Sequence, residues 1–176
     1  MTNKPKSYRS EEKKGTVLKE AMLADYLGFT SPVDMLFARL FEFIGLPKPR
    51  GKDPLESDLI PLIRKGLAKK NLEKLMHSTG LDLSAMAGIL HVSTRTLHRY
   101  TGESILNPDI SERLLEIARL YARGQEVFGD LDSFKGWIQE PVPALGYKKP
   151  LEYLDTSIGI RLLQDELGRI EHGVFS

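Results

Sequence analysis

Hydroxyl, imidazole and guanidinium side chains cluster between residues 93 and 99, the stretch of the sequence best suited to binding chemistry. If a helix begins after Ser93, Leu97 faces inward and the polar side chains face solvent. Guanidinium groups can donate two parallel hydrogen bonds to a guanine edge, and hydroxyls can contact phosphates or thymine methyl groups. The pattern therefore predicts a recognition helix for DNA. Its candidate contact residues are Ser93, Thr94, Arg95, Thr96, His98 and Arg99.

The residues before this run predict a second short helix packed against the first. Ala87 supplies the small side chain that two helices need where they cross at a steep angle, and Ser93 can cap the second helix. The turn position that usually holds glycine is His91, a residue type that tolerates a positive φ. The pair is therefore predicted to be a helix-turn-helix. The side chains spaced to be buried between its helices are Met86, Leu90, Val92 and Leu97.

Two other interpretations of this stretch stay open at the level of sequence. Short helix pairs that contain alanine are common, so the same spacing fits a helical hairpin with an ordinary solvated face. A helix-turn-helix can also lose DNA binding and serve only as a scaffold that binds other proteins.

Charge is distributed unevenly along the 176 residues, although the net charge is only +1. Residues 62–101 hold seven Lys and Arg against two acids, and residues 1–19 hold six against two. Residues 126–176 hold nine acids against five bases. A basic region could meet phosphates while an acidic region meets a different partner. Ordinary fluctuation of charge along a soluble chain is the alternative explanation.

The sequence has no pattern typical of an active site, a metal site or a cofactor site. It has no cysteine, which excludes disulfides and thiolate metal sites. None of the four histidines pairs with another histidine and a carboxylate on an obvious shared helix face. A P-loop, a dinucleotide-binding turn and a nucleophile elbow are all missing. We therefore expect no enzyme and no cofactor. We interpret Lys69 and Lys70 as a solvated helix face, with phosphate contact as the alternative. Ser84, Ser93 and Ser111 are interpreted as caps or helix surface.

Helical periodicity dominates and strand-like alternation is nearly absent, which predicts an all-α fold. Residues 1–12 look like a disordered basic tail. An apolar stripe from Val33 to Ile44 is a candidate dimer interface or part of the core. A long helix is expected from Pro108 to Phe128, with Gly124 weakening it. Further helices are expected before Gly66 and Gly80, over residues 84–90 and 94–101, around Phe134 and Trp137, and at the C-terminal end. The predicted N-caps are Ser31, Asp58, Asn107 and Thr156.

The last helix is expected to have an apolar side and a polar side. The apolar side comprises Ile158, Leu162, Leu163, Leu167 and Ile170. The residues expected away from it are Arg161, Gln164, Asp165 and Arg169. Arg169 and Glu171 could pair with one another or with a partner. Val174 and Phe175 then leave the helix beside a free carboxylate, and they either fold back onto their own domain or contact a partner.

From about Leu59 to Ser176 the sequence resembles the Xre/MbcA/ParS antitoxins, which pair with RES-domain toxins. In the helix-turn-helix the resemblance rests on Val92-Ser93-x-Arg95-Thr96-Leu97-x-Arg99, and after it on Ser111-Glu112-Arg113-Leu114 and Val127-Phe128-Gly129. Its most specific part is Trp137-Ile138-x-x-Pro141-x-Pro143-Ala144-Leu145-Gly146, then Pro150-Leu151-x-x-Leu154-Asp155-Thr156-x-x-Gly159 and Leu167-Gly168-Arg169-Ile170-Glu171-His172-Gly173-Val174-Phe175-Ser176. The family tends to have Asn at Val142, Gly at Tyr147 and Tyr at Phe175.

The resemblance implies an Xre-type helix-turn-helix domain followed by a helical C-terminal toxin-binding domain. It implies that the chain silences a RES toxin, an enzyme that degrades NAD⁺. The chain would do so by placing its own C-terminus in the toxin's active site. It also implies binding to the chain's own promoter as an autorepressor. The implied toxin-binding residues are Arg169, Glu171, Gly173, Val174, Phe175 and Ser176.

We expect three segments: 1–54, a tail and helical segment with a possible role in dimerisation; 55–124, the DNA-binding domain; and 125–176, the toxin-binding domain. A homodimer is expected because paired DNA half-sites suit two copies of a helix-turn-helix. The lack of cysteine, of a signal peptide and of a long apolar run predicts a cytoplasmic protein without a membrane partner. The alternative function is a stand-alone helix-turn-helix regulator whose C-terminal domain senses a partner.

Overall fold

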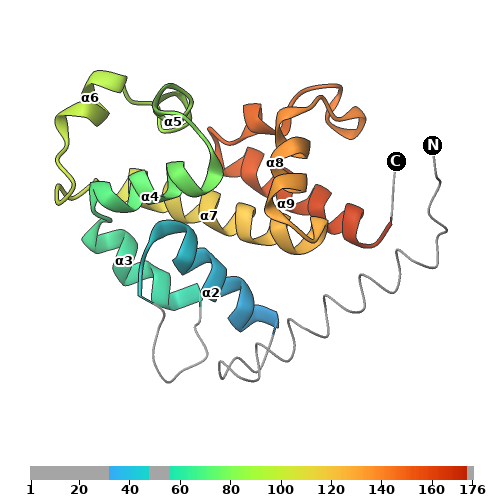
Figure 1. Cartoon of the computed structure of the whole chain (residues 1–176), viewed down its shortest axis with the longest axis horizontal. Coiled ribbons are helices and arrows are strands. Elements are labelled where there is room, and N and C mark those ends of the chain that lie inside the picture. The colour runs from blue at the N-terminus through green and yellow to red at the C-terminus, as the bar shows by residue number, and fades with distance from the viewer. Residues whose placement is uncertain (1–31, 48–55, 174–176) are drawn as a thin grey trace. The chain divides into compact units, whose positions relative to one another are not determined.

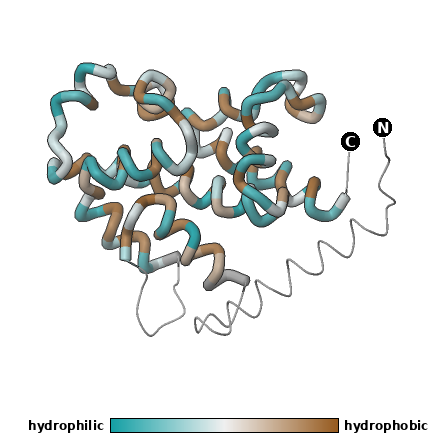
Figure 2. The backbone as a smooth tube through the Cα atoms, in the orientation of Figure 1, coloured by the Kyte–Doolittle hydropathy of each residue, from teal (hydrophilic) through white to brown (hydrophobic). Residues whose placement is uncertain are grey.

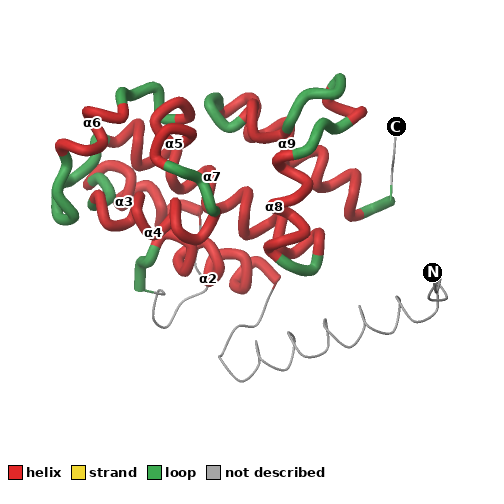
Figure 3. Tube along the Cα trace, turned by 45° about the horizontal axis from the view of Figure 1, so that its top comes forward, coloured by secondary structure: helices red, strands yellow, loops and turns green. Residues whose placement is uncertain are grey.

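The computed structural model describes residues 32–47 and 56–173 of the chain. The chain divides into two compact units, Met1–Met35 and Leu36–Ser176, and nearly all described residues belong to the second. The described residues form eight α-helices and no strand, which confirms the all-α prediction (Figure 3). The helices are α2 (Pro32–Ile44), α3 (Leu59–Lys65), α4 (Lys69–Thr79), α5 (Leu83–Ile89), α6 (Thr94–Arg99), α7 (Pro108–Phe128), α8 (Leu131–Gln139) and α9 (Ser157–Glu171).

Side-chain caps begin several of these helices as the sequence predicts. The Asn107 side chain accepts a hydrogen bond from the Ile110 amide at 2.8 Å, and Thr156 caps α9 in the same way. The prediction that the Asp58 side chain caps α3 is wrong. Asp58 precedes this helix, but its side chain makes no cap hydrogen bond. It ends the 3₁₀ helix η1 (Glu56–Asp58) and has helical φ and ψ, whereas N-cap residues are typically extended. The predicted cap Ser31 lies outside the described residues.

Helix α7 is the element around which the unit Leu36–Ser176 packs. It contacts α3 and α4 on one part of its surface and α8 and α9 on another. Figure 1 shows the α5–α6 pair over the first half of α7, with α8 and α9 beside its second half. Hydrophobic residues lie along α7 and the helices around it (Figure 2). One connected cluster of buried side chains therefore extends from Phe37 in α2 to Leu167 in α9.

The apolar stripe of α2 is part of this core. Among its described side chains, those that are buried are Phe37, Leu40, Phe41, Phe43 and Ile44. Phe43 packs edge-on against Tyr121 of α7, with ring centroids 6.1 Å apart. Of the two interpretations of this stripe, burial in the core is the one confirmed for these residues. The side chain of Val33 lies outside the described part.

Two polar residues predicted to lie at the surface are buried instead. Ser111 is fully buried, and its hydroxyl accepts a hydrogen bond from the Leu67 amide and donates one to the Asn107 carbonyl, each at 2.9 Å. Lys69 is 6% exposed and forms an ion pair with Glu73 at 2.7 Å. The sequence could not indicate either burial, because both depend on the loop between α6 and α7 crossing the start of α4.

The Pro-rich connection between α8 and α9 is ordered by two short helices. It contains the 3₁₀ helices η2 (Pro143–Leu145) and η3 (Pro150–Tyr153). The Tyr153 hydroxyl donates to the Leu145 carbonyl at 3.2 Å, which ties the two together. Tyr147 has a φ of 60° and is 75% exposed. An aromatic residue therefore occupies a left-handed position that favours glycine.

Gly124 permits the close approach of α7 and α8, although the sequence suggested only a weak point in the helix. It is buried, and a Cβ atom built there would overlap the ring of Phe134. Phe134 lies edge-on to Tyr121 with centroids 5.0 Å apart, and it stacks on Trp137 at 5.7 Å. The prediction that Gly124 weakens the helix relative to alanine is therefore incomplete, because tertiary packing leaves no space for alanine.

We expect Gly124→Ala to destabilise the protein by about 1–3 kcal/mol, because the extra methyl group overpacks the α7–α8 contact. The matched control is Gly136→Ala in α8, where an added Cβ meets no atom within 4 Å. That change should stabilise by up to about 1 kcal/mol through helix propensity. Urea unfolding of both variants measures the difference. Equal stability of the two variants would contradict a packing role for Gly124.

Candidate DNA-binding and partner-binding surfaces

Helices α5 and α6 form the predicted helix-turn-helix. The Asp82 side chain caps α5 by accepting from the Ala85 amide at 2.7 Å. Met86 and Leu97 are fully buried, so the two helices pack through the side chains predicted from their spacing. The order and burial of these residues place the polar side of α6 at the surface.

The six candidate DNA contacts divide into two groups. The Ser93 hydroxyl accepts a hydrogen bond from the Thr96 amide at 3.0 Å and lies 2.8 Å from the Thr96 hydroxyl. These two side chains therefore stabilise the start of α6. The other four are exposed, and within residues 32–47 and 56–173 their side chains have no hydrogen-bond or ion-pair partner. They are Thr94, Arg95, His98 and Arg99. The accessible polar surface of α6 thus carries two guanidinium groups, one imidazole and one hydroxyl.

His91 in the turn has a role that sequence reasoning missed. Its φ is 52°, which confirms the predicted left-handed turn position. Its Nε2 atom lies 3.0 Å from the carbonyl oxygen of Asp155, just before α9. Because a carbonyl only accepts, Nε2 must carry the proton and donate. The helix-turn-helix is therefore linked directly to the segment that leads into α9, and no sequence signal could have paired residues 64 positions apart.

Charged residues at the end of α9 pair with other residues of the chain and not with one another. Arg169 contacts Glu166 at 3.1 Å, and Glu171 contacts Arg123 of α7, so Arg169 and Glu171 do not pair with one another. Arg123 also binds Glu126 at 3.0 Å. Burial would lower the pKa of Arg123, but the two carboxylates outweigh it and raise that pKa. The Arg123–Glu171 ion pair thus joins the end of α9 to α7.

The implied toxin-binding residues lie at or beyond this end of α9. Arg169 and Glu171 are exposed, and Gly173 follows with a φ of 68°. Val174, Phe175 and Ser176 lie outside the described residues.

The buried side of α9 differs from the predicted one. Leu163 and Leu167 are fully buried as expected, but Ile160 takes the place that the pattern assigned to Ile158. Ile158 is 73% exposed and Leu162 is 38% exposed. Two side chains of the predicted apolar side therefore lie on the surface of α9.

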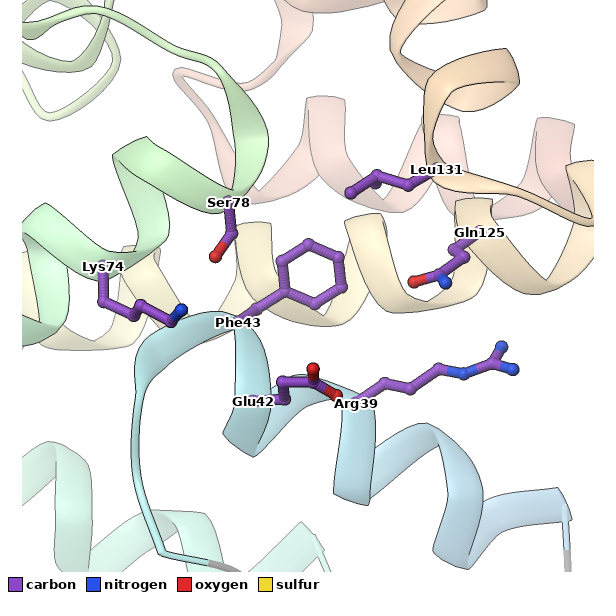
Figure 4. A pocket seen from close by; sticks show the side chains of 7 residues that line it. All are labelled: Arg39, Glu42, Phe43, Lys74, Ser78, Gln125 and Leu131. Atoms are coloured by element: carbon purple, nitrogen blue, oxygen red, sulfur yellow. The ribbon is translucent and has the colours of Figure 1, made fainter. Parts of the chain in front are cut away.

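A cavity of about 250 Å³ opens between α2, α4, α7 and the start of α8 (Figure 4). Charged and amide groups from three helices surround the ring of Phe43 there. The lining residues are Arg39, Glu42, Phe43, Lys74, Ser78, Gln125 and Leu131. In residues 32–47 and 56–173 we find no group of three or more His, Asp or Glu side chains able to hold a metal ion. No helix in this part of the chain is long and apolar enough to cross a membrane.

The segments that carry both candidate surfaces match known families. Residues 58–119 match the antitoxin Xre-like helix-turn-helix domain, and residues 123–173 match the antitoxin Xre/MbcA/ParS C-terminal toxin-binding domain. The chain belongs to the Xre antitoxins. One partner of this antitoxin is accordingly a toxin, and its helix-turn-helix domain implies DNA as another.

Individual relatives agree with this assignment. A Prs ADP-ribosylating antitoxin from Sphingobium sp. (strain YBL2) is 29% identical over 129 residues, which cover 68% of this chain and 81% of the relative. An antitoxin Xre from Yersinia enterocolitica is 28% identical over 139 residues, covering 78% of this chain and 90% of the relative. An antitoxin Xre from Photorhabdus laumondii is 27% identical with the same coverage.

Two substitutions of His91 should separate its hydrogen bond from its backbone conformation. His91→Ala loses the bond to the Asp155 carbonyl and keeps a side chain at positive φ, so we expect a loss of about 0.5–1.5 kcal/mol. His91→Gly loses the same bond but relieves a left-handed strain of about 1–2 kcal/mol, so it should remain near the wild-type stability. Urea unfolding gives both values, and an equal loss in the two variants would rule out a contribution from backbone strain.

Proposed function

We propose that this Xre antitoxin neutralises a RES-domain toxin, an enzyme that consumes NAD⁺. The antitoxin does so by placing its own last residues in the toxin's active site. The observation that carries the proposal is the anchoring of α9. Buried Leu163 and Leu167 hold this helix in the core, and Glu171 at its end pairs with Arg123 of α7. The residues that follow would thus leave from a fixed point within the segment that matches a toxin-binding domain.

The chemistry of the tail suits a concave active site. Val174 and Phe175 would fill it with apolar surface, which favours binding when that surface leaves water. The name of one relative, the Prs ADP-ribosylating antitoxin, refers to ADP-ribosylation. That reaction takes ADP-ribose from NAD⁺, so an NAD⁺-consuming toxin agrees with this relative as well as with the family resemblance.

We further propose that the antitoxin binds its own promoter as a homodimer and represses it. The exposed Thr94, Arg95 and Arg99 on α6 are suited to base edges and phosphates. A single helix of six residues makes few such contacts, whereas two copies can read half-sites about one DNA turn apart. Both roles are binding functions, and neither requires a catalytic group on this chain.

Arg95→Ala should weaken binding to promoter DNA by about 1–3 kcal/mol and relax the preference at one base pair. Arg161→Ala on the exposed side of α9 is the matched control, because it removes the same charge from a helix outside the helix-turn-helix. We expect the control to bind as the wild type does. Fluorescence anisotropy at two salt concentrations measures affinity and counterion release. Wild-type affinity of a folded Arg95→Ala variant would refute its role in DNA contact.

Deleting Gly173–Ser176 tests the neutralisation mechanism. The deletion starts after α9 ends at Glu171, so it should cost little fold stability. We expect loss of toxin neutralisation with unchanged promoter binding. The measurements are the growth of cells that co-express a RES-domain protein from the same genome, and DNA binding by the purified variant.

Each outcome of the deletion has a separate meaning. Normal growth with the truncated protein would refute insertion of the tail into the toxin. Loss of both neutralisation and DNA binding would show that the tail is part of the fold.

A further inference from the structure

The exposed side of α9 carries two large apolar side chains. Ile158 and Leu162 lie one helical turn apart and are 73% and 38% exposed. Among the described residues, large hydrophobic side chains are exposed at only five positions, and three of these fall within the toxin-binding segment 123–173. The five are Ile60, Ile105, Tyr147, Ile158 and Leu162.

The rotation of α9 about its axis is fixed, so Ile158 cannot simply turn inward. Gly159 lies so close to the Tyr153 carbonyl that a Cβ atom would overlap it. On the neighbouring residue, the Ser157 hydroxyl donates to Glu116 of α7 at 3.2 Å. Ile160 and Leu163 then occupy the core side of the helix. A β-branched residue gains no helix propensity at an exposed position, so Ile158 contributes little to the folded chain alone.

Charged side chains continue the same side of α9 toward its C-terminal end. We name the whole set the α9 stripe: Ile158, Arg161, Leu162, Asp165 and Arg169. All five are exposed, and their spacing is that of a helix lying in a groove of a partner. Arg161 and Asp165 have no hydrogen-bond or ion-pair partner among the described residues, whereas Arg169 is paired with Glu166. A fitting partner would offer an apolar groove with a carboxylate opposite Arg161.

We propose that the α9 stripe is a second docking surface for the toxin, with Ile158 and Leu162 as its apolar anchors. This inference rests on the proposed function. The stripe lies inside the toxin-binding segment, and it runs along α9, the helix that precedes the last residues of the chain. Contact along the stripe would align the tail with the active site before the last residues enter. It would also keep the toxin bound to an antitoxin that has lost its tail.

Isoleucine-to-aspartate and leucine-to-aspartate changes at matched exposed positions test the docking surface. Ile158→Asp and Leu162→Asp place a charge in the proposed apolar contact. Ile60→Asp and Ile105→Asp are the controls, because they place the same charge at exposed positions of the helix-turn-helix domain. Calorimetry measures the affinity of each full-length variant for a purified RES-domain protein from the same genome. We expect at least about tenfold weaker binding for the two α9 variants and wild-type affinity for the two controls. Thermal unfolding should be unchanged for Ile158→Asp, whose side chain is 73% exposed, and promoter binding should be unchanged in both α9 variants.

The outcomes separate this inference from the proposed function. Strong binding by the wild type and equally strong binding by both α9 variants would overturn the docking surface alone. Loss of self-association in sedimentation with unchanged toxin affinity would assign the stripe to a second copy of the chain and overturn the proposal. Failure of the wild type to bind this protein would overturn the proposed function, and the docking surface with it. Ile158→Ser, which adds no charge, should weaken binding less than Ile158→Asp does.

Discussion

Helix α7 buries ten of its 21 residues, and both candidate binding surfaces depend on that burial. Its first half packs against α3 and α4 beneath the helix-turn-helix, and its second half packs against α8 and α9. Leu114, Ile117 and Leu120 have no exposed surface at all. Burial of apolar surface of this extent is the main favourable term in folding, so α7 acts as a common support for two otherwise separate functions.

Because the support is shared, the two surfaces are held in a defined relation within the unit Leu36–Ser176. The His91 hydrogen bond to Asp155, the Ser157 bond to Glu116 and the Arg123–Glu171 ion pair each join the C-terminal segment to an earlier helix or turn. Each contact is partly exposed and individually weak. Together with the α7–α9 core they fix where the tail leaves the fold.

Helix α6 shows how few residues remain for contact once local structure is satisfied. Ser93 and Thr96 bond to one another and to the start of α6, leaving Arg95, His98 and Arg99 with Thr94 for a partner. A similar division holds in α9, where Ile160 and Leu163 serve the core while Ile158 and Leu162 face solvent. In both helices, the residues that build the fold and those available for binding alternate along the same short stretch.

The helices, most of their caps and the helix-turn-helix could be predicted from the sequence, because these features depend on neighbours three or four positions away. Asn107, Thr156 and Ser93 cap the helices predicted for them, and the left-handed turn at His91 was predicted from its position. The family resemblance likewise rested on local motifs, and both matched domains agree with it.

The buried side of α9 could not be predicted in this way, because two overlapping apolar patterns are present and packing against α7 and η3 selects one. The burial of Lys69 and Ser111, and the lack of space for a side chain at position 124, also became known only from the folded chain. These outcomes depend on elements that are distant in sequence and meet only when the core forms. Periodicity within a single helix carries no information about the space that its neighbours leave.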